Sequence, residues 1–375
     1  MQITKKTKLK GLKKTREIGP LGVVETLRKK KVTGRGGAGF LVAKKWKSVM
    51  DTKSDVKYLI CNGDEGEPGT FKDKFIIMNN SETLIEGIII AAETIGAKTV
   101  YFYLRGEYVN LRKFLENKIK KVLQKSNSNI EIIVVMGAGA YICGEETAII
   151  KSIEGYRGQP SYKPPFPWQE GLWEKPTVVN NVETFVHVAQ ALCFKDYNPN
   201  LKLYSVSGSV KKPGIYEELS GEKLSKIISK AKPINKPKAI YFGCFGGCKP
   251  YKEMKLIPKT ICGDDCVHGA ASLIVADNKT SAIDMAYIIS KFFTHESCGK
   301  CTPCREGNIQ ILLLLKKLRK GEATKKDFEL LKELSLHIQE TSLCGLGQTS
   351  TKHLLNAMKH FKKEFTDLLV KEKGE

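Results

Sequence analysis

The chain has little that would direct it out of the cell or into a membrane. Its Lys-rich start carries no signal-peptide pattern, and no apolar run approaches the length of a membrane span. Its 11 cysteines are unevenly spaced, which is typical of thiols that stay reduced or bind metal rather than of a secreted disulfide framework. We therefore expect a soluble, cytoplasmic protein.

The sequence also lacks the features with which basic proteins read nucleic acids. Its 62 Lys and Arg against 40 Asp and Glu give a net charge of +22, which by itself would suggest nucleic acid or an anionic membrane surface. However, it has no zinc-finger spacing and no aromatic-studded basic sheet, and its Lys are scattered over amphipathic helices. We expect no nucleic-acid partner. A Lys-rich proteome or docking onto an acidic partner subunit explains the charge.

The 375 residues suffice for two or three domains, with the first built around a parallel sheet. After the basic segment 1–31, short β-branched runs alternate with longer amphipathic ones, which is typical of a sheet flanked by helices. The expected strands are 56–61, 98–104 and 130–136, and the expected helices are 42–50, 81–95, 108–125, 145–154 and one ending near 192. Ligands of such sheets lie at the carboxyl ends of the strands.

Three loops near those ends carry candidate binding groups. The segment 34–40 has four Gly and precedes a helix, an arrangement that exposes N–H groups to phosphate, although it is also compatible with a simple turn. The acidic segment 62–69 could bind ribose or ribityl hydroxyls or could be a surface turn. The third is 137–144, which is followed by Glu145 and Glu146; these acids could bind ribose or merely complement a helix start.

Three cysteines spaced by two residues, Cys298, Cys301 and Cys304, predict a metal centre. A ferredoxin would supply its next Cys three residues later, so any fourth ligand here is distant, and Cys344 in a Gly-rich turn is the natural candidate. Structural zinc is the alternative, but zinc ligands usually come as two separated pairs. The pattern favours an iron-sulfur cluster.

The second half predicts a small domain and a helical bundle. A β-hairpin over 203–216 follows the Pro-rich loop 158–176, and four helices are expected at 282–294, 306–319, 325–339 and 351–370. The cysteine loops join the first two helices and the last two, so they can meet at one end of a bundle. An additional thiolate site could be formed by two Cys pairs, Cys244 with Cys248 and Cys262 with Cys266. The alternative is that these are unlinked buried thiols.

Six motifs together carry a resemblance to a known family: in order, they are GRGGAGF, CNGDEGEPGTFKDK, GAGAYICGEETA, TVVNNVET, ESCGKCTPCREG and SLCGLGQT. From about residue 30 to its end the chain resembles the flavoprotein (FMN- and NADH-binding) subunit of respiratory complex I, whose family includes diaphorase subunits of NAD-linked hydrogenases and formate dehydrogenases. The resemblance implies an α/β protein with a Rossmann-like FMN and NADH domain (1–195), a ubiquitin-like β-grasp domain (196–280) and a four-helix bundle with one 4Fe-4S cluster (281–375).

The resemblance also implies site residues. For FMN they are Gly34, Gly36, Gly37, Gly39, Lys45, Asn62, Asp64, Gly144, Asn180 and Asn181. For NADH they are Phe40, Glu65, Glu67, Glu145, Glu146 and Phe166, with Glu67 on the nicotinamide side and one of Glu145 and Glu146 favouring NADH over NADPH. The implied cluster ligands are Cys298, Cys301, Cys304 and Cys344.

The activity that the resemblance implies is NADH oxidation by the electron-input subunit of an NADH:quinone oxidoreductase. No side chain need act as acid or base, because the chemistry belongs to the cofactors. The implied partners are a thioredoxin-like 2Fe-2S subunit and a further iron-sulfur subunit, and the implied location is peripheral, at the inner face of the cell membrane. The chain lacks the thioredoxin-like and ferredoxin-like extensions of many hydrogenase-linked relatives, which favours complex I.

Overall fold

The computed structural model describes residues 2–252, 254, 256 and 271–370. These residues fall into two compact units. The first comprises Met1–Gly66 and Phe71–Leu203, and the second comprises Glu67–Thr70 and Tyr204–Glu375. The short segment Glu67–Thr70 therefore belongs to a different unit from the residues on either side of it.

The first unit is built on a four-stranded parallel sheet in the order β3-β2-β1-β4. The strands are β1 (Tyr58–Gly63), β2 (Thr99–Leu104), β3 (Glu131–Met136) and β4 (Thr177–Asn181). The predicted parallel sheet flanked by helices is confirmed, and three of its strands lie within two residues of their expected bounds. The fourth, β4, was expected only as the lead-in to a helix.

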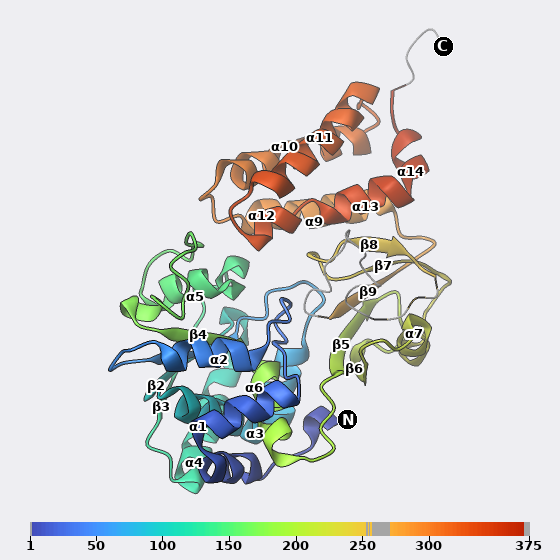
Figure 1. Cartoon of the computed structure of the whole chain (residues 1–375). Helices are drawn as coiled ribbons and strands as arrows, with labels where there is room; N and C mark the ends of the chain where they lie inside the picture. The colour runs from blue at the N-terminus through green and yellow to red at the C-terminus, as the bar shows by residue number, and fades with distance from the viewer. Residues whose placement is uncertain (1, 253, 255, 257–270, 371–375) are drawn as a thin grey trace. The chain divides into compact units, whose positions relative to one another are not determined.

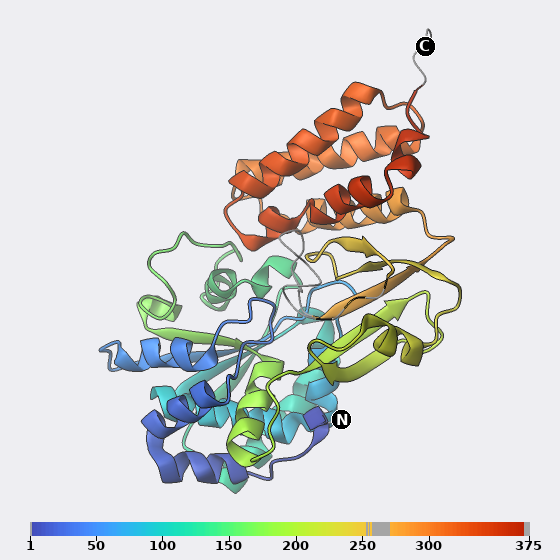
Figure 2. The same ribbon diagram turned by 45° about the vertical axis from the view of Figure 1, so that its right-hand side comes forward.

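Helices cover this sheet on both sides (Figures 1 and 2). On one side α1, α3 and α6 pack against one another. On the other side lies α5, whose Ser152 hydroxyl is 2.8 Å from that of Tyr103 on β2. The helices of this unit are α1 (Lys10–Lys29), α2 (Val42–Asp51), α3 (Lys72–Ile95), α4 (Arg112–Ser126), α5 (Glu146–Ile153) and α6 (Val182–Cys193).

Two expectations about the helices were wrong. No helix was expected in the basic segment 1–31, but most of it forms α1, which is kinked at Gly19 (φ 69°). The backbone of α3 is not helical at Asn80 (φ −142°, ψ 36°), so the expected helix from residue 81 follows a kink, and a further helical stretch from Lys72 precedes it. The whole of α3 is long and apolar enough to cross a membrane, contrary to the expectation that no such run exists. However, 78% of its most apolar 18-residue window is buried inside the protein, as in the core helix of a globular domain.

The second unit begins with a five-stranded sheet in the order β6-β5-β9-β7-β8. Its central strands β5 and β9 are parallel, whereas β7 is antiparallel to both of its neighbours. Helix α7 (Leu224–Ala231) packs Leu224, Ile227 and Ile228 onto the apolar core of this sheet. The strands are β5 (Leu201–Gly208), β6 (Gly214–Leu219), β7 (Pro237–Tyr241), β8 (Cys248–Pro250) and β9 (Ser272–Asp277).

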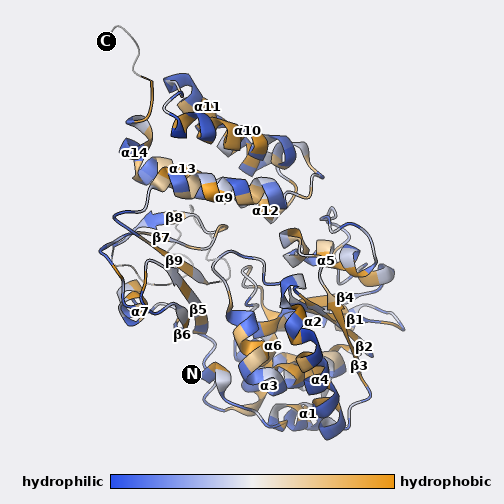
Figure 3. Cartoon of the chain, turned by 180° about the vertical axis from the view of Figure 1, so that it is seen from behind, coloured by the Kyte–Doolittle hydropathy of each residue, from blue (hydrophilic) through white to orange (hydrophobic). Residues whose placement is uncertain are grey.

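Among the described residues of the second unit, six helices follow the sheet, and Figure 3 shows both polar and apolar faces on several of them. Thr324 caps α11 with a capping box, as expected. The expected helix 351–370 is instead divided at Phe361, whose φ of −124° and ψ of 33° are not helical. The helices are α9 (Ala282–Glu296), α10 (Thr302–Arg319), α11 (Lys325–Thr341), α12 (Gly345–Thr349), α13 (Lys352–His360) and α14 (Lys362–Thr366).

Candidate cofactor sites

The sheet of the first unit has its topological switch point beside β1. The chain continues from β1 to β2 on one side, whereas β4 adds on the other side, and Asn62 pairs with Asn181 at the carboxyl ends of these strands. In open α/β sheets ligands bind in the crevice outside the carboxyl ends of such strands. The structure therefore puts the expected asparagines where a ligand of this fold would lie.

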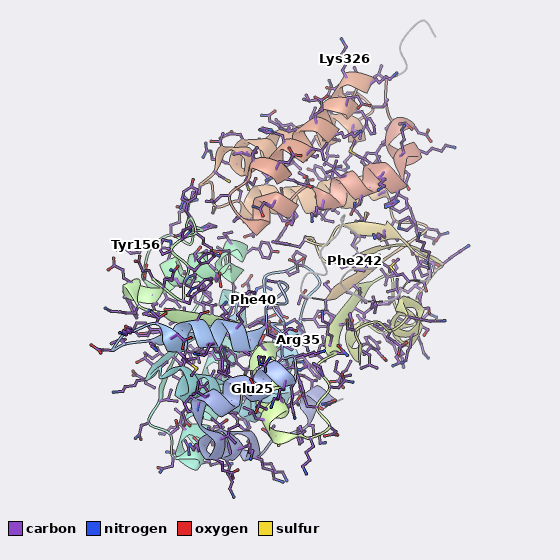
Figure 4. The ribbon with its side chains drawn as sticks, viewed as in Figure 1. Glu25, Arg35, Phe40, Tyr156, Phe242 and Lys326 are labelled. Carbon is purple, nitrogen blue, oxygen red and sulfur yellow. The ribbon has the colours of Figure 1, made fainter. Side chains whose placement is uncertain are left out.

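The Gly-rich loop reaches the same place. The Gly34 N–H donates to the Phe40 carbonyl at 2.8 Å and closes the loop, and Gly39 has a φ of 65°, which favours glycine. A Cβ added at Gly36 would lie 3.3 Å from the Cβ of Asn181, so glycine allows a close approach. The Phe40 ring is 47% exposed at the end of this loop (Figure 4).

Hydrogen bonds tie the other expected FMN residues to this corner. The Lys45 Nζ donates to the Val179 carbonyl at 2.9 Å, and the Trp46 indole donates to Asn180 Oδ1 at 2.9 Å. The Asn62 amide donates to the Gly144 carbonyl at 3.0 Å. Residues from five chain segments thus converge around the ends of β1 and β4, with glycine at the positions of closest approach.

A buried charge network lies directly behind this corner, and sequence reasoning missed it. The Lys72 ammonium is 2.7 Å from Asp73 and 3.1 Å from Glu183, and donates to Asn181 Oδ1 at 3.2 Å. Both carboxylates and the ammonium are at most 5% exposed in their side chains. The Asn181 amide donates to Asp73 at 2.6 Å, so the network fixes the orientation of an expected FMN residue. The KDK within the second motif was the only sequence signal.

Glu65 lies at the start of α3 rather than in open solvent. Its carboxylate accepts from the Asp73 N–H at 2.8 Å, from the Lys74 N–H at 3.0 Å and from the Tyr108 hydroxyl at 3.1 Å. Burial, and next the charge of Asp73, raise the pKa of Glu65 to about 7. The hydrogen bonds and Lys72 act in the opposite direction but do not overcome this effect.

The raised pKa of Glu65 predicts a pH dependence of stability. Between about pH 4.5 and about pH 7 the folded chain holds a proton on Glu65 that the unfolded chain has released, so the free energy of unfolding falls as pH rises through this window. Glu65→Gln should remove on the order of 1–3 kcal/mol of this fall. Chemical unfolding of both proteins across the window measures it. The exposed Glu170→Gln variant is the control, and an equal pH slope in Glu65→Gln and wild type would contradict the prediction.

Glu145 and Glu146 are both held by lysines. Glu145 caps α5 by accepting from the N–H groups of Thr147 and Ala148, and the Lys163 ammonium bridges both carboxylates at 3.0 and 2.8 Å. Glu146 also accepts from Lys45 at 2.8 Å. Burial alone would raise the pKa of Glu146, but Lys45 and Lys163 outweigh it and lower the pKa to about 2. Both roles considered for these acids, capping and ligand binding, remain compatible with this geometry.

Phe166 lies in the Pro-rich loop and stacks on Trp168. The ring centroids are 4.2 Å apart and the planes differ by 9°. This loop, 158–176, has no strand, as expected, and its only helical element among the described residues is the short 3-10 turn Leu172–Glu174. A preformed aromatic stack offers a flat apolar surface to a planar ligand.

Glu67, the expected nicotinamide contact, belongs to the second unit. Its Oε1 accepts from the N–H groups of Cys244 at 2.6 Å and Phe245 at 3.1 Å. Gly243 has a φ of 62°, and a Cβ there would lie 2.2 Å from the same oxygen. The turn between β7 and β8 therefore holds this carboxylate through its backbone.

Of the four expected cluster thiols, Cys298 and Cys301 lie in the α9–α10 connection, Cys304 lies in the first turn of α10 and Cys344 directly precedes α12. Figure 1 shows the labelled helices that carry these segments. Cys304 is buried and the other three are partly exposed. Burial raises the pKa of Cys304 to about 11, the Ser297 hydrogen bond acts in the opposite direction, and Cys301, Cys344 and Cys298 add to the rise. A Cβ at Gly347 would lie 3.2 Å from that of Cys304, so glycine lets the second loop approach the first.

No group of three or more His, Cys, Asp or Glu among the described residues is arranged to hold a single metal ion. A cubane cluster does not need this arrangement, because each thiolate binds a different iron atom.

Comparison with known proteins is consistent with both sites. Residues 27–190 match the family model described as the Nuo51 FMN-binding domain, and residues 284–368 match the NADH-ubiquinone oxidoreductase-F iron-sulfur binding region. The F subunit of the NADH-quinone oxidoreductase of Aquifex aeolicus is 40% identical over 94% of this chain and 87% of its own length. The chain belongs to this family. It thus carries the family's FMN-binding domain and 4Fe-4S region, as the motifs indicated.

The family extends to hydrogenases. The NAD-reducing hydrogenase HoxS subunit alpha of Cupriavidus necator is 36% identical over 95% of this chain and 62% of its own length. A crystal structure of an NAD+-reducing [NiFe]-hydrogenase in the H2-reduced state superposes with a TM-score of 0.89 at 34% identity, covering 95% of this chain and 64% of that one. The chain therefore spans less than two thirds of the length of these hydrogenase subunits.

The possible additional thiolate site remains untested. Cys244 and Cys248 are both buried, and Cys248 Sγ lies 3.7 Å from the His353 carbonyl. Burial, and next the charge of Glu67, raise the pKa of Cys244 well above its usual value. Cys262 and Cys266 lie outside the described residues.

Proposed function

We propose that the chain is the NADH-oxidising, electron-input subunit of an NADH:quinone oxidoreductase. The chemistry that the bound groups supply is hydride acceptance by FMN from NADH and one-electron relay by a 4Fe-4S cluster. The observation that carries the proposal is the convergence of the Gly-rich loop, Lys45 and the asparagines at the switch point of the sheet, in a chain that belongs to this family.

In this proposal FMN lies against the ends of β1 and β4. The backbone of the Gly-rich loop receives the phosphate, and Lys45 contributes charge, while the amides of β1 and β4 orient the isoalloxazine ring through hydrogen bonds. The full FMN set is Gly34, Gly36, Gly37, Gly39, Lys45, Asn62, Asp64, Gly144, Asn180 and Asn181. The pre-existing hydrogen bonds of this set lower the entropy cost of ordering the site.

NADH would stack on the flavin between aromatic side chains. Phe40, exposed at the loop end, and Phe166, in the aromatic stack, present flat surfaces worth about 1 kcal/mol per ring pair. The proposed NADH contacts are Phe40, Glu65, Glu67, Glu145, Glu146 and Phe166. Glu65 is the weakest of these, because its carboxylate is already occupied at the start of α3.

The proposed cluster ligands are Cys298, Cys301, Cys304 and Cys344. The finer domain assignment belongs to the same proposal: a Rossmann-like domain over 1–195, a β-grasp domain over 196–280 and a helical bundle over 281–375. The strand order β6-β5-β9-β7-β8, with one helix between β6 and β7, supports the β-grasp assignment, because it is the order 2-1-5-3-4 of a five-stranded sheet with parallel central strands.

The proposed partners are a thioredoxin-like 2Fe-2S subunit and a further iron-sulfur subunit of a multi-subunit complex, which is peripheral at the inner face of the cell membrane. The second candidate function is that of a diaphorase subunit of a hydrogenase or formate dehydrogenase. The matches to hydrogenase subunits favour it specifically. Co-purification distinguishes the two, since the complex would contain either a quinone-reducing arm or a hydrogen-oxidising or formate-oxidising subunit.

One experiment tests the core of the proposal. The matured protein is purified, its FMN and iron contents are measured, and NADH is added while the flavin absorbance is followed. We expect one FMN and one 4Fe-4S cluster per chain and rapid bleaching by NADH. A colourless preparation that is inert towards NADH would refute the proposal.

The acids at the start of α5 predict the choice of nucleotide. The double variant Glu145→Asn, Glu146→Gln keeps a capping side chain on α5. It removes the negative charge that the 2′-phosphate of NADPH would meet. We expect the ratio of kcat/KM for NADPH to that for NADH to rise about tenfold, equivalent to about 1.4 kcal/mol. The exposed Glu131→Gln variant, on β3, is the control. An unaltered ratio would exclude these acids as selectors.

A further inference from the structure

Two side chains outside the expected ligand set contact the sulfur of Cys304. The Ser297 hydroxyl oxygen is 3.3 Å from Cys304 Sγ, and the Asn308 Nδ2 is 3.4 Å from it. Cys304 is the buried member of the four thiols, at 5% exposure. Its sulfur therefore meets two potential donors in a region from which water is largely excluded.

The direction of the Asn308 amide is fixed by its neighbours. Asn308 lies one turn after Cys304 on α10, and its Nδ2 also donates to the Cys304 carbonyl at 2.8 Å. Both groups near Nδ2 are acceptors, so the reversed amide would place an oxygen against an oxygen. Asn308 is 1% exposed, and its Oδ1 has no hydrogen-bond partner among the residues that the structure describes. Burying an amide whose oxygen has no partner costs free energy. This cost suggests that the hydrogen bonds made by the amide nitrogen to Cys304 serve a function.

The Ser297 hydroxyl is directed in a similar way. Its oxygen accepts from the Gly299 N–H at 3.4 Å, which leaves the hydroxyl hydrogen available for Cys304. A thiolate that binds iron has no hydrogen to donate, so in the loaded protein the Ser297 O–H is the donor of this pair. Ser297 follows α9 directly and Asn308 lies within α10, so two different elements hold the two donors.

We propose that Ser297 and Asn308 are positioning residues that hydrogen-bond the Cys304 thiolate and raise the reduction potential of the cluster. The inference rests on the proposed function, because it requires Cys304 to be a ligand. Adding one electron makes the cluster and its thiolates more negative, and donors aimed at sulfur stabilise that form more than the oxidised one. The burial of Cys304 keeps water from screening this effect.

The test is an EPR-monitored redox titration of the matured protein. Ser297→Ala and Asn308→Leu each remove a donor, and each should lower the midpoint potential. We expect the ratio of reduced to oxidised cluster at a fixed potential to fall about tenfold in each variant, which is about 59 mV for a one-electron couple. Ser297→Thr keeps a hydroxyl and should restore the wild-type value.

Ser342→Ala is the matched control. Ser342 is buried, its Oγ has no hydrogen-bond partner among the described residues, and it packs beside Gly347 near Cys304. Removal of this hydroxyl should leave the potential unchanged. Unshifted potentials in both Ser297→Ala and Asn308→Leu, with iron content retained, would overturn the inference, and so would an equal shift in Ser342→Ala.

A second measurement needs no variant. Wild-type protein with the side-chain amide of asparagine labelled with ¹⁵N should show hyperfine coupling of that nitrogen to the reduced cluster. Absence of the coupling would overturn the role of Asn308 even if Asn308→Leu failed to fold. A wild-type preparation without any cluster signal would instead refute the proposed function, so the two failures are distinguishable.

Discussion

Cys344→Ser is expected to remove the iron-sulfur cluster and to leave the flavin in place. Three of the proposed ligands lie in the α9–α10 connection and the first turn of α10, whereas Cys344 directly precedes α12. It is thus the only thiol of the four that ties the second loop to the first. A three-thiolate remainder with a hydroxyl in the fourth position holds a 4Fe-4S cluster poorly, because soft thiolate is the ligand that iron-sulfur clusters require.

Iron, sulfide and FMN contents together measure this outcome. We expect iron per FMN to fall from about four towards zero, while NADH still bleaches the flavin. Cys193→Ser is the matched control, because Cys193 is also a partly exposed cysteine but lies in the first unit. A complete and unshifted cluster spectrum in Cys344→Ser would remove Cys344 from the ligand set.

Lys72→Met should be the most destabilising single change beside the proposed FMN site at the ends of β1 and β4. Lys72 is 1% exposed, and its ammonium contacts Asp73 and Glu183 and donates to Asn181. Burial by itself would raise the pKa of Glu183, but Lys72 outweighs it and holds that pKa far below its usual range. Removing the ammonium leaves two buried carboxylates without their counterion, a change that typically costs 3–5 kcal/mol, so we expect a loss of about 4 kcal/mol.

FMN binding should fall in the same variant, because Asn181 loses a donor that orients its side chain. Chemical unfolding and FMN content per chain are the measurements. Lys74→Met is the control: Lys74 is an exposed neighbour on α3, and its replacement should change stability by less than about 0.5 kcal/mol. Adding Glu183→Gln to Lys72→Met should recover part of the loss, because one unpaired charge is then removed. Equal stability of wild type and Lys72→Met would contradict the network's importance.

Local sequence patterns carried the prediction of the parallel sheet and of the cluster loop. Strands β1, β2 and β3 are apolar runs bounded by polar segments, and Cys298, Cys301 and Cys304 form a spacing that is visible without a fold. Strand β4 was missed because its five residues lead directly into α6, and Asn181 caps that helix as well as ending the strand. Strands β7 and β8 were missed because they are short, and their sequences show no clear alternation of apolar and polar residues.

The buried groups behind the sites could not be predicted from the sequence for a different reason. Lys72 meets Glu183, and Asn181 meets Asp73, only because the fold brings together residues more than 100 positions apart. In the sequence, Lys72 is one of many lysines, each of which is most simply read as solvent-exposed. The direction of Asn308 likewise depends on which atoms surround it on the folded helix.

The placement of Glu67–Thr70 has a practical consequence for dissecting the protein. Because this four-residue segment belongs to the second unit while Gly66 and Phe71 belong to the first, the polypeptide connects the units at three points rather than one. A fragment that stops at residue 203 would keep Glu67 but lose Cys244 and Phe245, whose amides hold its carboxylate. Such a fragment would no longer hold the Glu67 carboxylate in place, so the proposed role of Glu67 is better tested by point substitution in the whole polypeptide.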